Sequence, residues 1–151
     1  FEVELVAALG RGGQDIPTAD ALDHVYAYAV GLDMTRRDVQ DEAKRLSRPW
    51  DLAKSADASA PIGPLHPVEG RRHPMRGAIT LSVDDNPRQA GDLSEMIWSV
   101  ADQIALLSTY FELHPGDLIF TGTPSGVGAV ERGQVMQAAI EGFGAIRLNV
   151  V

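Results

Sequence analysis

The alternation of hydrophobic and polar residues along the chain predicts several strands. Apolar, β-branched and aromatic residues gather in short runs bounded by turn formers, which is typical of strands that are half or fully buried. On this basis we expect strands at residues 1–9, 25–34, 78–83, 118–121 and 145–151.

Residues spaced by three or four, as on one face of a helix, appear in three other segments. A short helix is expected to follow Thr18, a residue type favoured at N-caps, and a second helix is expected over residues 35–46 with Thr35 as its cap. A third is expected to begin at a capping box formed by Asp92 and Glu95. Its apolar stripe consists of Ile97, Val100, Ile104 and Leu107.

The remaining segments are rich in glycine, proline, serine and aspartate. Residues 10–17, 50–74, 84–87 and 122–133 are therefore expected to be loops or turns. Several strands, few helices and long connections favour a β-rich α+β domain over the regular alternation of a doubly wound sheet. We expect residues 1–151 to form one such domain.

The composition narrows the function classes. Of 151 residues 44% are hydrophobic, and 21 acidic against 13 basic side chains give a net charge of −8. Without a stripe of lysine and arginine, nucleic acid is an unfavourable partner, and the apolar stretches are too short to cross a membrane. The chain has no cysteine, so any strongly bound metal is expected to be a hard cation with oxygen or imidazole ligands.

Three carboxylates are candidates for such a metal site. Glu2 and Glu4 are two residues apart in the first strand, so both side chains project from the same face. Asp33 follows near the end of another strand and could complete a set of oxygen ligands. The alternative is the solvated face of an ordinary half-buried strand, and the spacing alone favours that alternative.

Three polar residues after Asp33 are candidates for binding an anionic substrate. Arg37 and Gln40 are three residues apart on one helical face, and a guanidinium binds carboxylates in bidentate fashion. Lys54 lies among small residues and could approach an anion as a point charge. For Arg37 and Gln40 the spacing alone favours an ordinary solvated helix face, and for Lys54 it does not separate a surface lysine from a binding one.

Several familiar catalytic motifs are absent. The glycine-rich loop at 121–128 lacks the lysine of a phosphate-binding Walker loop, and Ser125 is not flanked by glycines at the spacing of an α/β-hydrolase nucleophile. The four histidines are scattered in turns and helix ends without the spacing of a zinc protease; they are His24, His66, His73 and His114.

Read together, the segments resemble the fumarylacetoacetate hydrolase family, and within it the acylpyruvases. The resemblance rests on Glu2-Val3-Glu4-Leu5, on residues 31–40 with their Asp-Met-Thr-Arg-Arg-Asp run, on 48–54, 59–64 and 96–97, and on the long stretch 113–128. Their order and spacing agree over essentially the whole chain. The family resemblance implies a β-rich, mixed-sheet roll with few helices.

The resemblance also implies roles for individual residues. Glu2, Glu4 and Asp33 would be ligands of Mg²⁺ or Mn²⁺, with Ca²⁺ as an alternative. The substrate's 2-keto-acid end would be surrounded by Arg37, Gln40, Lys54 and Thr123, with Lys54 acting in catalysis. The reaction implied is hydrolysis of a carbon–carbon bond in an acylpyruvate, with fumarylpyruvate as the substrate expected in aromatic catabolism.

Family members also carry a catalytic histidine, paired with a glutamate, on an upstream segment that closes over the site as a lid. None of the four histidines here matches it, so the chain is expected to begin after that segment. The resemblance further implies a homodimer that acts on a small anionic 2-keto acid. Such a substrate, together with the absence of cysteine and of targeting signals, favours a cytoplasmic location. Two alternatives stay open: a decarboxylase or isomerase of oxaloacetate or a related 2-oxo acid, and a metal-binding fragment without catalysis.

Overall fold

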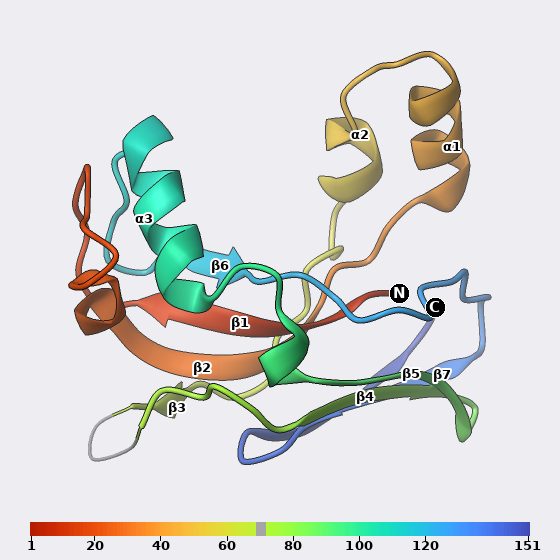
Figure 1. The fold of residues 1–151 in the computed structure, drawn as a ribbon. Coiled ribbons are helices and arrows are strands. Elements are labelled where there is room, and N and C mark those ends of the chain that lie inside the picture. Colours follow the sequence, from red (N-terminus) through yellow and green to blue (C-terminus); the bar gives the residue numbers. More distant parts are fainter. Residues whose placement is uncertain (69–71) are drawn as a thin grey trace.

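Two four-stranded antiparallel sheets pack face to face in the computed structural model, which describes residues 1–68 and 72–151 (Figure 1). The first sheet has the order β3-β2-β1-β6, with β1 Val3–Leu9, β2 Val25–Leu32, β3 His66–Pro67 and β6 Leu118–Phe120. The second has the order β5-β4-β7-β8, with β4 Ala78–Val83, β5 Asn86–Asp92, β7 Val135–Ile140 and β8 Gly144–Asn149.

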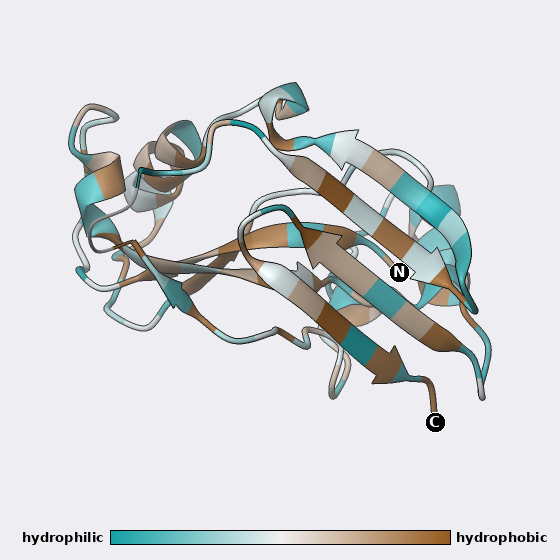
Figure 2. Cartoon of the chain, turned by 90° about the horizontal axis from the view of Figure 1, so that it is seen from below, coloured by the Kyte–Doolittle hydropathy of each residue, from teal (hydrophilic) through white to brown (hydrophobic). Residues whose placement is uncertain are grey.

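The core lies between the two sheets. Every second residue of β1 faces it, from Val3 to Leu9, and inward side chains of β2, β4 and β7 complete the core. Figure 2 shows the matching alternation of hydrophobic and hydrophilic residues along the second sheet. Because side chains alternate along a strand, the intervening residues of β1 project from the opposite face of the first sheet. Glu2, at the start of this segment, and Glu4 are on that opposite face.

The helices lie over this opposite face of the first sheet. In Figure 1, α1 (Arg37–Arg45) and α2 (Asp51–Lys54) stand above one end of the sheet, and α3 (Val100–Tyr110) stands above the other. Two short 3₁₀ helices complete the described elements, η1 (Ala21–His24) and η2 (Leu93–Glu95). The helical pair α1–α2 therefore lies at the end of β1 that carries the two glutamates.

The expected α+β class with few helices is confirmed, as are the five expected strands. Every strand pairing of the described residues is antiparallel, so the sheets are not of the mixed kind that was expected. The capping box of Asp92 and Glu95 is present but caps η2. A second box, formed by Ser99 and Asp102, starts α3. Ile97 lies between the two and is 96% exposed, so it does not belong to the helical stripe.

Several elements escaped the sequence prediction. The segment of β5 contains asparagine, proline, glycine and aspartate, and that of β7 contains two alanines; these residue types have low strand propensity. β7 also pairs with β4, which lies far from it along the chain. The expected loop at 50–74 contains α2 and β3, and its residues 69–71 lie outside the described part of the chain. The caps expected at Thr18 and Thr35 are not formed, because Asp20 and Arg36 precede the two helices instead.

Candidate metal centre

Three carboxylates converge above the first sheet. Glu2 and Glu4 project from the same face, and the pairing of Val3 with Leu32 brings Asp33, just beyond the end of β2, beside Glu2. The backbone N–H of Asp33 donates a hydrogen bond of 2.9 Å to the carbonyl of Glu2. One carboxylate oxygen from each of Glu2, Glu4 and Asp33 lies within 4.8 Å of the others. The structure thus brings together the three ligands that the resemblance implies.

Two cations face this cluster from the helices above it. Lys54, at the end of α2, donates hydrogen bonds to Glu2 Oε2 at 2.9 Å and Asp33 Oδ2 at 2.5 Å. Arg37, at the start of α1, donates from Nη2 to Glu2 Oε1 at 2.8 Å. Thr35 donates its hydroxyl hydrogen to the same oxygen, which explains why it does not cap α1. Both cations are partly buried, so these ion pairs are less screened than pairs in open solvent.

Gln40 holds the guanidinium of Arg37 in place. Its side chain is buried, and its Oε1 accepts a hydrogen bond of 3.0 Å from Arg37 Nη1. The three-residue spacing therefore places both side chains on one helix face, as predicted. The Nε atom of Arg37 is buried and has no hydrogen-bond partner among the described residues. Since buried donors are normally paired, this N–H is suited to donate to a bound ligand.

Glu4 is the most deeply buried of the three carboxylates, at 4% exposure. Burial, together with the negative charges of Asp33 and Glu2, raises the pKa of Glu4 to about 7. A hydrogen bond of 2.7 Å from the backbone N–H of Gly122 to Glu4 Oε2 opposes this rise in pKa. A carboxylate in this position gains from a nearby cation, which would offset both the burial and the repulsion.

The neighbouring charges shift two further groups. Burial acts to raise the pKa of Glu2, but the hydrogen bonds and charges of Lys54 and Arg37 outweigh it, so the pKa of Glu2 is lowered. Burial likewise acts to lower the pKa of Lys54, but its bonds to Asp33 and Glu2 outweigh that effect, so its pKa is raised. Both ions are therefore charged at neutral pH.

The glycine-rich loop after β6 is fastened to β1 by side-chain hydroxyls. Beyond the end of β6, Thr121 Oγ1 donates to the carbonyl of Leu5 at 2.8 Å, and Thr123 Oγ1 donates to the carbonyl of Val3 at 2.8 Å. Thr123 thus lies beside the candidate site, but its hydroxyl hydrogen is used within the protein. The predicted role of Thr123 in substrate binding therefore cannot rest on donation by its hydroxyl.

The donor set fits a hard divalent cation. Three carboxylates supply oxygen atoms at one place, and oxygen ligands are those that Mg²⁺, Mn²⁺ and Ca²⁺ prefer. When all are ionised, the three carboxylates and the two cations, Lys54 and Arg37, have a net charge of −1. A bound divalent cation would make the net charge of the site positive. A positive site is suited to an anionic ligand, and the unpaired Nε of Arg37 points to the same class of ligand.

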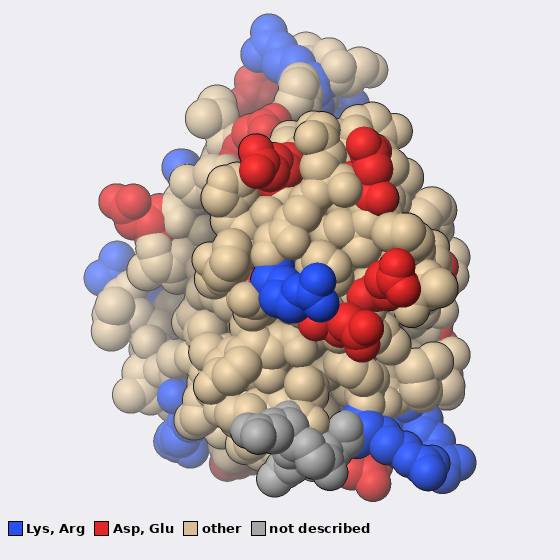
Figure 3. All heavy atoms as spheres, turned by 90° about the vertical axis from the view of Figure 1, so that its left-hand side faces the viewer, with Lys and Arg blue, Asp and Glu red and all other residues tan. Residues whose placement is uncertain are grey.

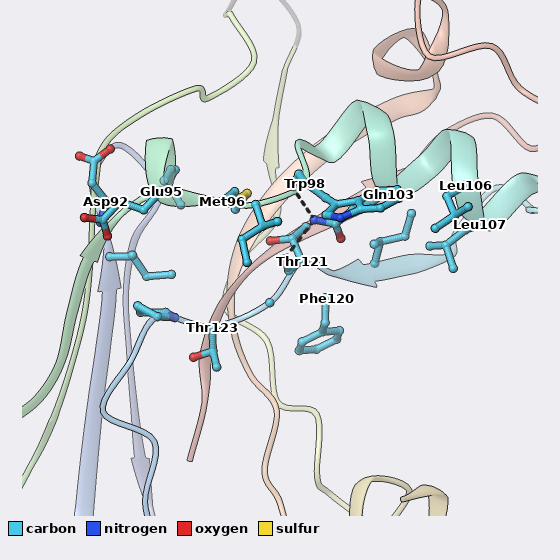
Figure 4. Close-up of a pocket in the computed structure, with 16 residues that line it drawn as sticks. Asp92, Glu95, Met96, Trp98, Gln103, Leu106, Leu107, Phe120, Thr121 and Thr123 are labelled. Carbon is cyan, nitrogen blue, oxygen red and sulfur yellow. Dashed lines mark hydrogen bonds between the residues drawn. The ribbon is translucent and has the colours of Figure 1, made fainter. Parts of the chain in front are cut away.

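An apolar cavity of about 540 Å³ adjoins the same loop (Figure 4). Met96, Trp98, Leu106 and Phe120 line it together with Gly122 and Thr123. Gln103 spans its wall, because its Nε2 donates hydrogen bonds of 3.1 Å to the carbonyls of both Trp98 and Thr121. The loop that holds Glu4 therefore forms a wall of this cavity.

Sequence reasoning missed one polar side chain at the site. Gln89 on β5 is 2% exposed and bonds to both β1 and the loop after β6, although it comes from the second sheet. Its surroundings, Pro-Arg-Gln-Ala-Gly, have no spacing that distinguishes it from a surface residue. No histidine of the chain hydrogen-bonds to the three carboxylates in the described region. His24, His73 and His114 hydrogen-bond instead to Arg11, Tyr28 and Glu112, respectively.

The outer surface has no continuous basic stripe on the face shown in Figure 3, where uncharged side chains predominate and acidic ones are interspersed. None of the helices in the described residues has the length and apolar character needed to cross a membrane.

Comparison with known proteins gives consistent matches over the whole chain. Residues 1–151 match the family model described as fumarylacetoacetate (FAA) hydrolase C-terminal. The chain is 43% identical over 150 residues to fumarylpyruvate hydrolase of a Ralstonia species, covering 99% of this chain and 78% of the relative. It is 45% identical over 149 residues to the mitochondrial oxaloacetate tautomerase of Rattus norvegicus, covering 99% of this chain and 67% of the relative.

A solved structure also matches. The crystal structure of fumarylpyruvate hydrolase from Pseudomonas aeruginosa, in complex with Mn²⁺ and pyruvate, has a TM-score of 0.96 and 56% sequence identity. The match covers 99% of this chain and 64% of that chain. The 151 residues therefore span slightly less than two thirds of this relative.

Proposed function

The chain belongs to the fumarylacetoacetate hydrolase family, and from this premise we propose that it is the catalytic body of a divalent-metal-dependent hydrolase. The proposed reaction cleaves a carbon–carbon bond in an acylpyruvate, with fumarylpyruvate as the substrate and with fumarate and pyruvate as products. Because the chain spans only part of its relatives, the activity is proposed for the longer protein that contains it.

The observation that carries this proposal is the convergence of three carboxylates, Lys54 and Arg37 above one end of the first sheet. The names of the relatives support it. The similar enzyme from Pseudomonas aeruginosa was crystallised with Mn²⁺ and pyruvate, which are an ion of the proposed class and a product of the proposed reaction. Whether Mg²⁺ or Mn²⁺ serves this protein is left to direct metal titration.

A cation held by Glu2, Glu4 and Asp33 would supply Lewis acidity toward the keto and carboxylate oxygens of the substrate. The chain itself supplies the remaining positive charge. Lys54 has three N–H donors and uses two of them on carboxylates, so one is left for the substrate. Both terminal nitrogens of Arg37 already bond within the protein, and its buried Nε–H, which has no partner among the described residues, is a donor available to a substrate carboxylate.

Hydrolysis adds water to the carbonyl that is distant from the pyruvate carboxylate and breaks the adjacent carbon–carbon bond. The electron pair of that bond goes to the enolate of pyruvate, which then takes up a proton. Lys54 stabilises the charge that develops on this enolate, which is the kind of interaction that lowers the barrier most. The resemblance assigns the base that activates water to a histidine outside these residues, and this assignment remains a prediction.

In this proposal Thr123 binds the substrate through its backbone N–H and not through its hydroxyl. Its hydroxyl hydrogen is donated to Val3, and a carboxylate can only accept hydrogen bonds. Its backbone N–H makes no hydrogen bond within the described residues and is the remaining donor. Thr123→Val would therefore disturb β1, whereas it would leave this backbone donor in place.

A second function uses the same enolate chemistry. Oxaloacetate is a 2-oxo acid with the same keto-acid end, and a relative at 45% identity is an oxaloacetate tautomerase. Tautomerisation or decarboxylation needs no water added to a carbonyl. The two readings therefore differ in whether a water-activating base is required.

Steady-state assays of the longer protein on both substrates test the proposal. With saturating Mn²⁺, we expect kcat/KM for fumarylpyruvate to exceed that for oxaloacetate by at least about tenfold, which is a difference of 1.4 kcal/mol in transition-state binding. Comparable values would leave the hydrolase assignment without support. Metal binding with no turnover of either substrate would favour a metal-binding module.

The proposal includes a homodimer, and the surface around α3 offers an interface for a second copy. Ile97 is 96% exposed and stands between two hollows of the same surface, which share Ile97, Trp98 and Leu106 in their linings. A surface with a protruding side chain beside a hollow is self-complementary across a two-fold axis, because the side chain of each copy can enter the hollow of the other. If Ile97→Ser left a dimer intact in light scattering, this placement of the interface would be wrong.

A cytoplasmic location also remains a prediction.

A further inference from the structure

Gln89 is the one buried residue of β5. At 2% exposure its amide is out of contact with solvent, whereas the residues on both sides of it are exposed. A buried amide is tolerated only when its donors and acceptor are paired, because each unpaired polar group loses its hydration without compensation. The partners of Gln89 therefore indicate what holds it there.

All of these partners lie at the candidate metal centre. Gln89 Oε1 accepts a hydrogen bond of 3.0 Å from the backbone N–H of Val3, the residue between Glu2 and Glu4. Its Nε2 donates to Thr123 Oγ1 at 2.8 Å and to the carbonyl of Pro124 at 2.9 Å. One side chain from the second sheet thus binds both the ligand-bearing end of β1 and the loop beside it.

This arrangement replaces a missing strand pairing. β6 pairs with β1 only from Val6 to Ala8, and just beyond it the backbone N–H of Thr121 bonds to the Leu5 carbonyl, so the outer backbone groups of Val3 have no strand partner on that side. The Leu5 carbonyl is paired by Thr121, the Val3 carbonyl by Thr123 and the Val3 N–H by Gln89. Gln89 also fixes Thr123 itself, so it closes a ring of hydrogen bonds around this end of β1.

We propose that Gln89 is a positioning residue for the metal centre: it fixes the end of β1 that carries Glu2 and Glu4, and the loop whose Gly122 N–H binds Glu4. This inference rests on the proposed function, because it concerns the same carboxylates. Gln89 touches none of the three directly. It acts through Val3, Thr123 and Pro124, and its removal would allow the carboxylates and the loop to move apart.

The test is the affinity for Mn²⁺, measured by electron paramagnetic resonance on the folded protein, together with the melting temperature. Gln89→Met keeps the length of the side chain but removes all of its hydrogen bonds. We expect Mn²⁺ affinity to fall by about 10- to 100-fold, the usual effect of losing a partner that orients metal ligands. Gln89→Asn keeps the amide but shortens its reach. We expect the Mn²⁺ affinity of this variant to lie between that of Gln89→Met and that of the unaltered protein.

Ser108→Ala provides the matched control. Ser108 is also fully buried and bonded on both sides, because it accepts from the Ile16 N–H and donates to the Ala105 carbonyl, far from the three carboxylates. We expect this variant to lower the melting temperature while leaving Mn²⁺ affinity within about twofold, as for changes at independent sites. A purely structural role for Gln89 predicts the same behaviour for both residues.

Unchanged Mn²⁺ affinity in Gln89→Met, or in Gln89→Asn if the first variant does not fold, would overturn the inference. An equal loss of affinity in Ser108→Ala would overturn it too, since the effect would then follow stability alone. Failure of the proposed function looks different: the unaltered protein would bind Mn²⁺ and lose affinity on Gln89→Met, yet turn over neither fumarylpyruvate nor oxaloacetate.

Discussion

The two sheets use the same alternation of side chains with different results. In β4 and β7 of the second sheet, burial alternates along the strand, and polar residues such as Thr80 face away from the core. In β1 of the first sheet every residue is buried, including Glu4 on the face away from the core. That face is covered by α1, α2 and the loop after β6, which supply Arg37, Lys54 and the Gly122 N–H.

The comparison of the two sheets shows that the alternation of side chains along a strand determines which residues share a face. It does not determine what covers that face. A polar position on an uncovered face is an ordinary solvated residue, and its loss costs little. A carboxylate on a covered face needs partners, and a set of such carboxylates with cations around it forms a site.

Replacing the cation above the first sheet should have the largest effect on activity. Lys54→Met is expected to lower kcat for fumarylpyruvate by about 10²- to 10³-fold, the usual cost of removing a donor that meets developing charge. The matched control is Lys44→Met on α1, whose ammonium lies 5.2 Å from the centre of the Trp50 ring and away from the carboxylates. An unchanged kcat in Lys54→Met would remove Lys54 from the mechanism.

Removing a charge from the covered face should weaken metal binding. Glu4→Gln keeps the shape of the side chain. Because Glu4 is itself a proposed ligand, we expect Mn²⁺ affinity to fall by at least about 100-fold, the upper end of the effect of losing a partner that only orients ligands. Glu141→Gln is the control. Glu141 lies in the turn after β7, and its carboxylate accepts an exposed hydrogen bond from the backbone N–H of Ala78. Calorimetric titration with Mn²⁺ measures both; similar affinities in the two variants would contradict the comparison.

A third prediction concerns the packing on the covered face. A Cβ at Gly31 would lie 2.4 Å from Val6 Cγ2 and 2.8 Å from Phe120 Cε1, so Gly31→Ala forces these side chains to move. We expect the free energy of unfolding to fall by about 1–3 kcal/mol, as for other overpacked sites. Thr80→Ala, on the uncovered face of β4, is expected to stay within about 0.5 kcal/mol. Urea denaturation compares them, and equal losses would mean that both faces are equally tolerant.

The smallest effect is expected at Asp92, at the end of β5. Hydrogen bonds from the Ser94 hydroxyl and backbone N–H lower the pKa of Asp92 below its usual 3.8. A lowered pKa means that this carboxylate contributes stability above pH 3.8, and that the contribution is lost as the pH falls through the folded-state value. Melting temperatures of Asp92→Asn and the unaltered protein should therefore differ at pH 6 and converge in strong acid. A constant difference would show that the cap does not depend on the charge.

Local signals were enough for much of the fold. The runs that form β1, β2 and β4 are rich in valine, isoleucine, leucine and tyrosine, and their alternation was sufficient to predict them. The segment of β5 could not be found in this way, since its one buried residue is a glutamine. It becomes a strand because β4 offers an unpaired edge, and the two-residue turn at Asp84 and Asp85 brings it back along that edge.

The sequence by itself determined that Glu2 and Glu4 share a face and that Arg37 and Gln40 share another, because strand and helix periods act over a few residues. The family resemblance then selected these residues as a site. Only the tertiary structure decided that Lys54, 52 residues from Glu2, stands between two carboxylates, and that Gln89, 86 residues from Val3, holds their strand. Such contacts depend on how the sheets and helices pack, and no local pattern records them.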